Sequence, residues 1–266
     1  MNILEKIVAV KKQEIARHKA LNPYPILEQS AYFNRKTLSL KENILNAEKS
    51  GIIAEFKRKS PSKGIINEKA DVKEVTIGYA TAGASGLSVL TDQDFFGGKN
   101  EDLTTARQYN EIPVLRKEFI IDEYQVVEAK SVGADAILLI AAILNPGQIK
   151  TLARFAESLK MEVLLELHTE DELRHLNEFV DLVGINNRNL KDFSVNMEKS
   201  IQMAGEIPKG FVKIAESGIS SVDTLLAFKQ NGFDGFLMGE MFMKNNKPEE
   251  ACRNFIHELP YFKKNK

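Results

Sequence analysis

The chain has 266 residues, of which 27% are charged and 43% hydrophobic, and its formal net charge is −1. This is the composition of an ordinary globular protein, and the near-zero charge gives no reason to expect nucleic acid or a membrane surface as a partner. The single cysteine, Cys252, excludes a disulfide framework and a cysteine-based metal cluster within one chain. No apolar run approaches the roughly 18 residues of a transmembrane helix, and the amino terminus lacks the apolar core of a signal peptide, so we expect a cytoplasmic protein.

The first 50 residues predict helices rather than strands. Residues 1–20 form an amphipathic pattern whose apolar side comprises Ile3, Leu4, Ile7, Val8 and Ile15. Pro23 and Pro25 interrupt this pattern, and further helices are expected over residues 26–33 and 40–49. We therefore expect residues 1–50 to form a helical extension that packs on the part of the chain that follows.

From residue 51 onward, short apolar runs alternate with amphipathic stretches. Eight runs predict strands, over residues 51–56, 86–91, 112–116, 135–141, 162–166, 180–185, 211–215 and 234–238. Several runs, such as residues 136–141, are apolar throughout, which is typical of strands that are covered on both faces in a parallel sheet. Helix starts between the strands are indicated by Asp71-x-x-Glu74, Thr169-x-x-Glu172 and Asn145-Pro146.

A weak internal repeat supports a count of eight units. Gly83, Gly133 and Gly232 each end a helical stretch directly before a predicted strand. The first two lie 50 residues apart and the last two 99, which fits two and four units of about 25 residues. We predict an α/β fold in which residues 51–266 form a single (β/α)8 TIM barrel, as one domain with the helical extension. An open, doubly wound sheet is the alternative, but eight evenly spaced strands favour closure.

Polar residues follow most of the predicted strands. In a barrel of this kind, functional groups stand at the carboxyl ends of the strands, and here these ends carry Glu55, Lys57, Asp92, Arg116, Lys117, Glu118, Glu166, His168, Asn186, Arg188, Glu216 and Glu240. Lys117, Glu166 and Glu216 lie 49 and 50 residues apart, close to two repeat units each, so they point into one shared mouth. Alternation along its strand makes Glu166 face inward, whereas either Arg116 or Lys117 could do so.

Other charged residues near these strands are expected to have structural or solvent-facing roles. His168 lies next to a predicted helix-capping residue, and Lys59 and Lys63 lie in a polar loop. The four histidines do not have the spacing of metal ligands.

Two glycine turns suit a phosphate group. Ser217-Gly218 follows the seventh predicted strand and Gly239-Glu240 follows the eighth. Glycine allows the backbone to approach an anion closely, and barrels often bind phosphate after strands seven and eight.

The segments that carry these residues resemble the indole-3-glycerol-phosphate synthase family, the ring-closing enzymes of tryptophan biosynthesis. The resemblance covers essentially the whole chain, including the helical extension. It is most specific in Ile53-Ala54-Glu55-Phe56-Lys57-Arg58-Lys59-Ser60-Pro61-Ser62, and it continues in residues 89–92, 95–98, 115–120, 138–141, 165–168, 184–190, 215–219 and 238–240.

This resemblance implies a carboxy-lyase that converts 1-(2-carboxyphenylamino)-1-deoxyribulose 5-phosphate into indole-3-glycerol phosphate, carbon dioxide and water, without a cofactor or metal. By similarity, Lys117 is the general acid and Glu166 a catalytic carboxylate, and the catalytic set is completed by Glu55, Lys57, Asn186 and Glu216. The implied substrate contacts are Ser60, Arg188 and Ser217, with Phe96, Phe119 and Leu138 around the aromatic ring and Gly218, Gly239 and Glu240 at the phosphate. The sequence Gly239-Glu240-Met241-Phe242-Met243 departs from the serine-containing turns of the family, which leaves only backbone contacts to the phosphate expected there.

Two other functions remain open at this level. A sugar-phosphate isomerase or a Schiff-base aldolase would use the same barrel, the latter with Lys117 as the nucleophile. A non-catalytic barrel that binds a phosphorylated metabolite would show binding without turnover. We expect a small phosphorylated substrate, a monomer or weak homo-oligomer, and a loop after the first strand that closes over the substrate.

Overall fold

The computed structural model describes residues 3–188 and 194–262. Within these ranges, eight parallel strands form a closed barrel in which the first strand pairs with both the second and the last. The strands are β1 (Ile52–Phe56), β4 (Gly86–Leu90), β5 (Val114–Lys117), β6 (Ala136–Ile140), β7 (Glu162–Leu167), β8 (Leu182–Asn186), β9 (Val212–Glu216) and β10 (Gly235–Met238). The predicted TIM barrel and all eight predicted strands are therefore confirmed.

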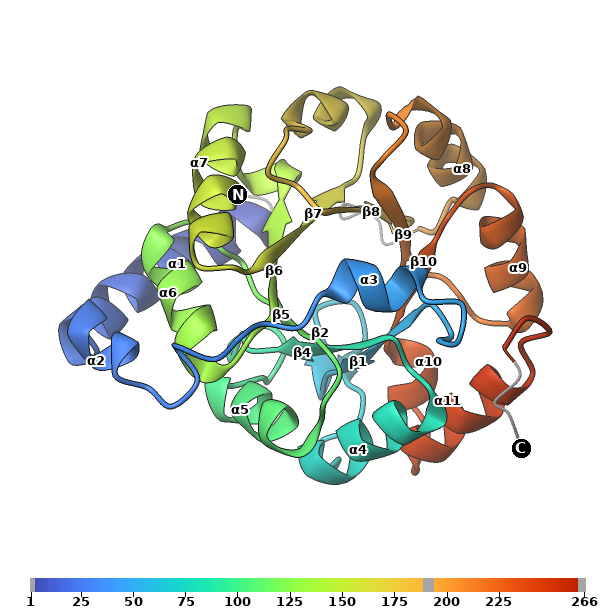
Figure 1. Ribbon diagram of the computed structural model, residues 1–266, viewed down its shortest axis with the longest axis horizontal. Helices are drawn as coiled ribbons and strands as arrows, with labels where there is room; N and C mark the ends of the chain where they lie inside the picture. The colour runs from blue at the N-terminus through green and yellow to red at the C-terminus, as the bar shows by residue number, and fades with distance from the viewer. Residues whose placement is uncertain (1–2, 189–193, 263–266) are drawn as a thin grey trace.

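Helices surround the barrel on the outside (Figure 1). They are α4 (Val72–Ala82), α5 (Asn100–Tyr109), α6 (Glu123–Val132), α7 (Pro146–Ser158), α8 (Met197–Glu206), α9 (Val222–Gln230), α10 (Glu240–Met243) and α11 (Pro248–His257), with 3-10 helices at Ala141–Ile143 and Glu170–His175. Asn145 caps α7 in a complete capping box with Gln148, as the Asn145-Pro146 signal predicts. Thr169 and Glu172 also form a capping box, but the helix that follows Thr169 is the 3-10 helix Glu170–His175 rather than an α-helix.

The strands are buried on both faces, which explains their continuous apolar sequences. Ile52 and Ala54 pack toward the surrounding helices, whereas Ile53 between them joins the core inside the barrel. The inner core comprises Ile53, Leu115, Leu138, Leu164, Leu182, Ile214 and Leu237, among others. This filled interior fixes the strand ends, and therefore the side chains that stand there, in a rigid frame.

The helical extension reaches both ends of the barrel. α1 (Ile3–Leu21) brings Ile7 into the inner core, and α3 (Leu40–Leu45) brings Leu40 and Ile44 into the same core. Leu40 would lie 2.5 Å from a Cβ at Gly86, the first residue of β4, so α3 covers the amino ends of the strands. α3 lies across the near end of the barrel in Figure 1, and the backbone N–H groups of Leu40 and Lys41 donate to Glu162 at the start of β7.

Two helix predictions in this extension need correction. The helix expected over residues 26–33 is α2, which spans Tyr24–Glu28. Pro23 and Pro25 follow the end of α1 at Leu21, as expected, but they also lie at the start of α2, where proline is tolerated. The helix expected over residues 40–49 ends at Leu45, where the extended backbone of Asn46 stops it. In addition, the loop after β1 contains a short hairpin, β2 (Lys59–Ser60) and β3 (Gly64–Ile65), which we did not predict.

Candidate active site

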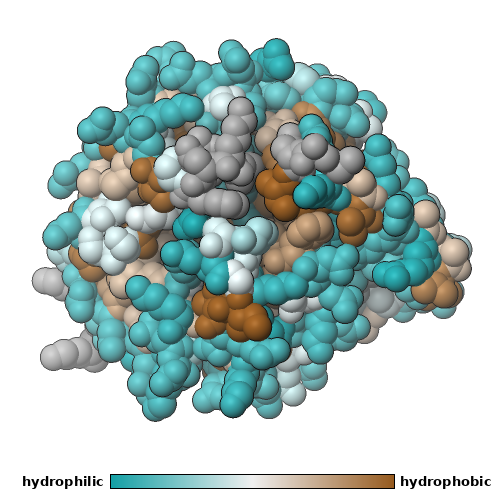
Figure 2. All heavy atoms as spheres, turned by 180° about the vertical axis from the view of Figure 1, so that it is seen from behind, coloured by the Kyte–Doolittle hydropathy of each residue, from teal (hydrophilic) through white to brown (hydrophobic). Residues whose placement is uncertain are grey.

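A cavity of about 280 Å³ opens at the carboxyl ends of the strands. All fifteen residues proposed for the site line it, and they are Glu55, Lys57, Ser60, Phe96, Lys117, Phe119, Leu138, Glu166, Asn186, Arg188, Glu216, Ser217, Gly218, Gly239 and Glu240. Figure 2 shows the face opposite that of Figure 1, where hydrophobic side chains gather near the middle of a largely hydrophilic surface. Asn189 and Leu190, which belong to one of the family-like segments, lie outside the described residues.

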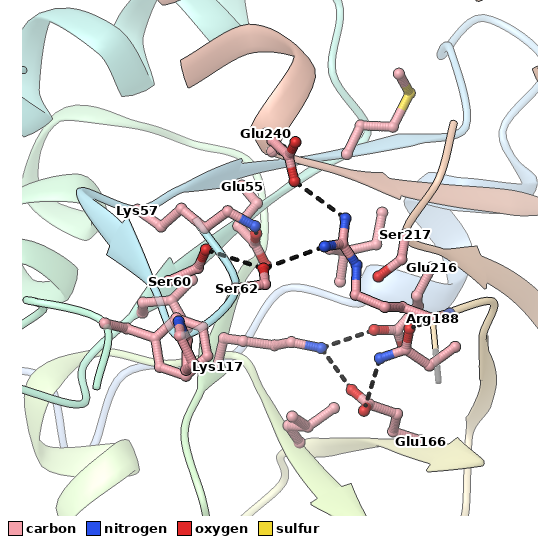
Figure 3. A pocket seen from close by; sticks show the side chains of 18 of the residues that line it. Glu55, Lys57, Ser60, Ser62, Lys117, Glu166, Arg188, Glu216, Ser217 and Glu240 are labelled. Carbon is pink, nitrogen blue, oxygen red and sulfur yellow. Dashed lines mark hydrogen bonds and ion pairs between the residues drawn. The ribbon is translucent and has the colours of Figure 1, made fainter. Parts of the chain in front are cut away.

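The centre of the site is an ammonium group between two carboxylates (Figure 3). Lys117, at the end of β5, places Nζ 2.7 Å from Oε2 of Glu166 and 2.7 Å from Oε2 of Glu216. Glu216 comes from β9, directly across the barrel from β5, whereas Glu166 comes from β7, two strands along from β5. Of the two basic residues that could face inward, Lys117 does so, whereas Arg116 points outward and binds Glu128 of α6.

This arrangement separates the proton affinities of the two carboxyl groups. Burial raises the pKa of Glu216 to about 7, with Lys117 opposing the effect and Glu166 adding to it. Burial alone would also raise the pKa of Glu166, but Lys117 and His168 hold it well below its ordinary value. Burial would lower the pKa of Lys117, yet the surrounding glutamates raise it, so the amine is charged at neutral pH. The trio therefore holds one firmly ionised carboxylate and one carboxyl group that titrates near neutrality.

The side chain of Glu216 fits only because residue 184 of β8 is glycine. A Cβ at Gly184 would lie 2.0 Å from Oε1 of Glu216. This oxygen is buried and has no hydrogen-bond partner among the described residues, which favours the neutral acid. Gly184 is thus part of the packing that sets the protonation of Glu216.

Glu166 is held from two further sides. Asn186 Nδ2 donates to its Oε1 over 3.0 Å, and His168 Nε2 lies 3.2 Å from the same oxygen. We expected His168 to be a structural neighbour of a helix cap, but it contacts this carboxylate without lining the cavity. Burial lowers the pKa of His168, but Glu166 outweighs burial and raises it. Its position two residues after Glu166 was the available signal, because alternate residues of a strand share a face.

A second ion pair lies beside the first. Lys57 Nζ is 2.6 Å from Oε1 of Glu55 at the end of β1. A Cβ at Gly239 would lie 2.6 Å from the same oxygen, so glycine after β10 leaves the space that Glu55 occupies.

The charges of Lys59 and Lys63 lie outside this cluster, since Lys59 binds the carbonyl oxygen of Asp94 and the exposed Lys63 lies 3.8 Å from Glu240.

One end of the cavity is apolar. Phe96 and Phe119 face each other with ring centroids 6.0 Å apart, and Leu138 lies in the same apolar cluster. The first turns of α1 complete this end with Ile3, Leu4 and Ile7. The sequence showed that these three residues share one side of a helix, but not which surface that side covers.

The other end is polar and has an unusual backbone. Ser217 has a left-handed conformation with φ 67°, which a residue other than glycine rarely adopts, and Gly218 follows with φ 75°. The side chain of Asn187 holds this turn by donating to the carbonyl oxygen of Ser217 over 2.7 Å. Arg188 lies at the rim and donates to Ser62 and to the carboxylate of Glu240, each over 3.1 Å (Figure 3). Strained backbone of this kind is concentrated at ligand-binding sites.

Comparison with known proteins assigns the whole arrangement to one family. A family model for indole-3-glycerol phosphate synthase matches residues 4–255. The chain belongs to the indole-3-glycerol phosphate synthase family. The indole-3-glycerol phosphate synthase of Bacteroides thetaiotaomicron is 45% identical over 258 residues, which cover 97% of this chain and 99% of the relative. That of Albidiferax ferrireducens is 43% identical over 251 residues, covering 93% and 95%.

Solved structures that resemble this synthase family member show the fold alone. A structure of the tryptophan synthase complex from Pyrococcus furiosus matches with a TM-score of 0.58 at 13% identity, covering 80% of this chain and 98% of that chain. Thiamine phosphate pyrophosphorylase from the same organism matches with a TM-score of 0.58 at 16% identity, covering 82% and 99%. Among the described residues, no helix is long and apolar enough to cross a membrane.

Proposed function

We propose that the chain catalyses the reaction that gives its family its name, the closure of 1-(2-carboxyphenylamino)-1-deoxyribulose 5-phosphate to indole-3-glycerol phosphate with loss of carbon dioxide and water. The observation that carries this proposal is the contact of Lys117 with Glu166 and Glu216 in a cavity whose two ends differ. The apolar end matches an aromatic ring, and the polar end matches a sugar phosphate.

Ring closure requires a proton donor at the ketone of the substrate. The ring carbon that bears the carboxylate attacks the C2 carbonyl, a carbon–carbon bond forms, and negative charge grows on the ketone oxygen. The charged Lys117 donates a proton to this oxygen, which becomes a hydroxyl group. General acid catalysis of this kind contributes about 10²–10⁴-fold. Cleavage of the bond to the carboxylate then restores the aromatic ring and releases carbon dioxide.

Dehydration requires an acid and a base. The new hydroxyl group leaves as water after receiving one proton, and the five-membered ring gives up another as its double bond forms. With a pKa of about 7, Glu216 carries a transferable proton at neutral pH, whereas Glu166 is ionised and accepts one. We assign the acid role in dehydration to Glu216 and the base role to Glu166, which Asn186 orients through its hydrogen bond. Glu55 and Lys57 form a second ion pair beside these groups, in which the two charges neutralise each other.

The substrate must bend so that its two ends meet, and the cavity ends provide the two fixed points. The ring lies among Phe96, Phe119 and Leu138, and the ribulose chain is contacted by Ser60, Arg188 and Ser217. The phosphate binds at Gly218, Gly239 and Glu240 through backbone N–H groups. The side chain of Glu240 is negative and already binds Arg188, which is a reason to assign the phosphate to the backbone at this position.

The context of the reaction follows from the same chemistry. A small phosphorylated substrate is the partner that the site requires, and we propose a cytoplasmic enzyme that is a monomer or a weak homo-oligomer. The buried Cys252, which is the single cysteine of the chain, fits a reducing compartment.

The test is to incubate the purified protein with the carboxyphenylamino deoxyribulose phosphate and follow the indole chromophore. We expect indole-3-glycerol phosphate and carbon dioxide in equal amounts. Binding of the substrate without an indole signal would contradict the proposal and leave a binding barrel. An aldolase would instead form a Schiff base, so borohydride would attach the substrate covalently to Lys117, whereas we expect no adduct.

A further inference from the structure

A lysine outside the cavity connects the helical extension to the apolar end of the site. Lys11 of α1 is 1% exposed. Its Nζ lies 2.8 Å from Oδ2 of Asp92, 3.1 Å from Oε1 of Glu118 and 2.7 Å from Oε2 of Glu14. Asp92 and Glu118 follow β4 and β5, so a single ammonium group joins α1 to two neighbouring barrel loops.

Both buried carboxylates hold the backbone of a phenylalanine in the ring pocket. Oδ1 of Asp92 accepts from the N–H groups of Phe95 and Phe96, over 2.6 and 3.1 Å. Oε1 of Glu118 accepts from the N–H of Phe119 over 2.8 Å. Two sets of contacts therefore connect Lys11 to the backbone of Phe96 and Phe119, whose rings contact each other at the apolar end of the cavity.

We propose that Lys11 is a positioning residue for the aromatic ring of the substrate, acting through Asp92 on Phe96 and through Glu118 on Phe119. The inference rests on the proposed function, because the ring pocket is defined by that substrate. Without the ammonium group, Asp92 and Glu118 are two carboxylates buried near one another and must move apart or take up protons. Either response shifts the N–H groups that they hold, and with them Phe96 and Phe119. The phosphate end, on β9 and β10 across the barrel, is not reached by these contacts.

The alternative is that Lys11 only anchors α1, in which case its loss loosens the whole cavity mouth. The two roles are separated by Lys11→Met, which keeps the length of the side chain and removes its charge. The matched control is Lys19→Met on the same helix, where the lost pair with Asp122 is partly exposed and neither residue lines the cavity.

The experiment measures competitive inhibition of turnover by two small molecules that resemble the ends of the substrate, 2-aminobenzoate and inorganic phosphate. For Lys11→Met we expect the inhibition constant of 2-aminobenzoate to rise about tenfold to a hundredfold, the range for a small misplacement of binding groups. We expect the constant for phosphate to stay unchanged, and both constants to stay unchanged in Lys19→Met. Equal rises for both inhibitors in Lys11→Met, or no rise for 2-aminobenzoate, would overturn the inference.

A milder variant protects the test against misfolding. If Lys11→Met does not accumulate as folded protein, Glu118→Gln keeps the shape of the side chain and breaks one of the two sets of contacts, and the same selective effect on 2-aminobenzoate is expected. A wild-type protein that forms no indole contradicts the proposed function, whereas an active wild type with equal effects on both inhibitors contradicts only the role of Lys11.

Discussion

Replacing Glu216 with glutamine tests whether the site holds a carboxyl group that the fold keeps protonated. Burial raises the pKa of Glu216 to about 7 from an ordinary value of 4.5. Each pH unit between these values corresponds to about 1.4 kcal/mol, so ionising Glu216 in the folded protein costs about 3 kcal/mol of stability. Glutamine has nearly the same shape and cannot ionise.

The sign follows from proton binding in the two states. Between pH 4.5 and 7, Glu216 has lost its proton in the unfolded chain but keeps it in the folded one, so wild-type stability falls as the pH rises. The stability that the proton provides is complete below pH 4.5 and is lost as the pH rises through about 7. The Glu216→Gln variant does not lose stability in this way, because glutamine has no proton to release over this pH range. The variant should therefore match the wild type near pH 4.5 and exceed its free energy of unfolding by about 3 kcal/mol at pH 8.

Urea denaturation of both proteins across this pH range measures the difference directly. Glu178→Gln is the control, because Glu178 is fully exposed and binds Lys150 at the surface, and its difference from the wild type should not grow in this way. We also expect Glu216→Gln to lose turnover by at least about a hundredfold, since the amide cannot transfer a proton. A difference in unfolding free energy that stays constant from pH 4.5 to 8 would refute the assignment of the titrating carboxyl to Glu216.

Three other outcomes are expected at the same centre. Lys117→Met should lower kcat by at least about a hundredfold while the substrate still binds, as measured by steady-state kinetics and by binding, and unchanged turnover would shift the acid role to Lys57. Gly184→Ala should displace Glu216, because Oε1 of Glu216 would lie 2.0 Å from the new Cβ. We expect kcat to fall by about tenfold to a hundredfold, and an unaltered kcat would mean that catalysis does not require Glu216 at this position. His168→Gln should raise the pKa of Glu166, because the contact with His168 lowers that pKa. The acidic limb of the pH profile of kcat/KM should therefore move to higher pH. If the acidic limb stays at its wild-type pH, His168 has no influence on the reacting groups.

The fold was predictable because its signals are local. A strand buried on both faces requires a continuous apolar run, and each such run in residues 51–238 corresponds to a strand of the barrel. The error at α2 arose from a residue whose effect depends on position, since Pro23 and Pro25 end one helix pattern and also begin the next helix. The short β2–β3 hairpin carries no apolar alternation and left no signal.

The part of the site that could be predicted comprises the residues indicated by the repeat spacing or by the family resemblance. Lys117, Glu166 and Glu216 stand at matching points of the barrel repeat, so their convergence follows from the fold class. The roles of His168 and Lys11 could not be predicted in this way. Lys11 meets its partners Asp92 and Glu118 only after the chain has folded, and nothing near position 11 distinguishes this lysine from the others on the same helix.

The helical extension has a consequence for synthesis of the protein on the ribosome. Its residues leave the ribosome first, yet Lys11 pairs with residues 92 and 118, and α3 binds Glu162 and covers strands up to β10. Lys11 therefore lacks its full set of partners until residue 118 has been made, and α3 lacks Glu162 until more than half of the chain has been made. During this interval they are exposed to chaperones and proteases, and slow translation between residues 50 and 160 would lengthen the exposure. The segment that covers both ends of the finished barrel is thus made before the strands that it covers.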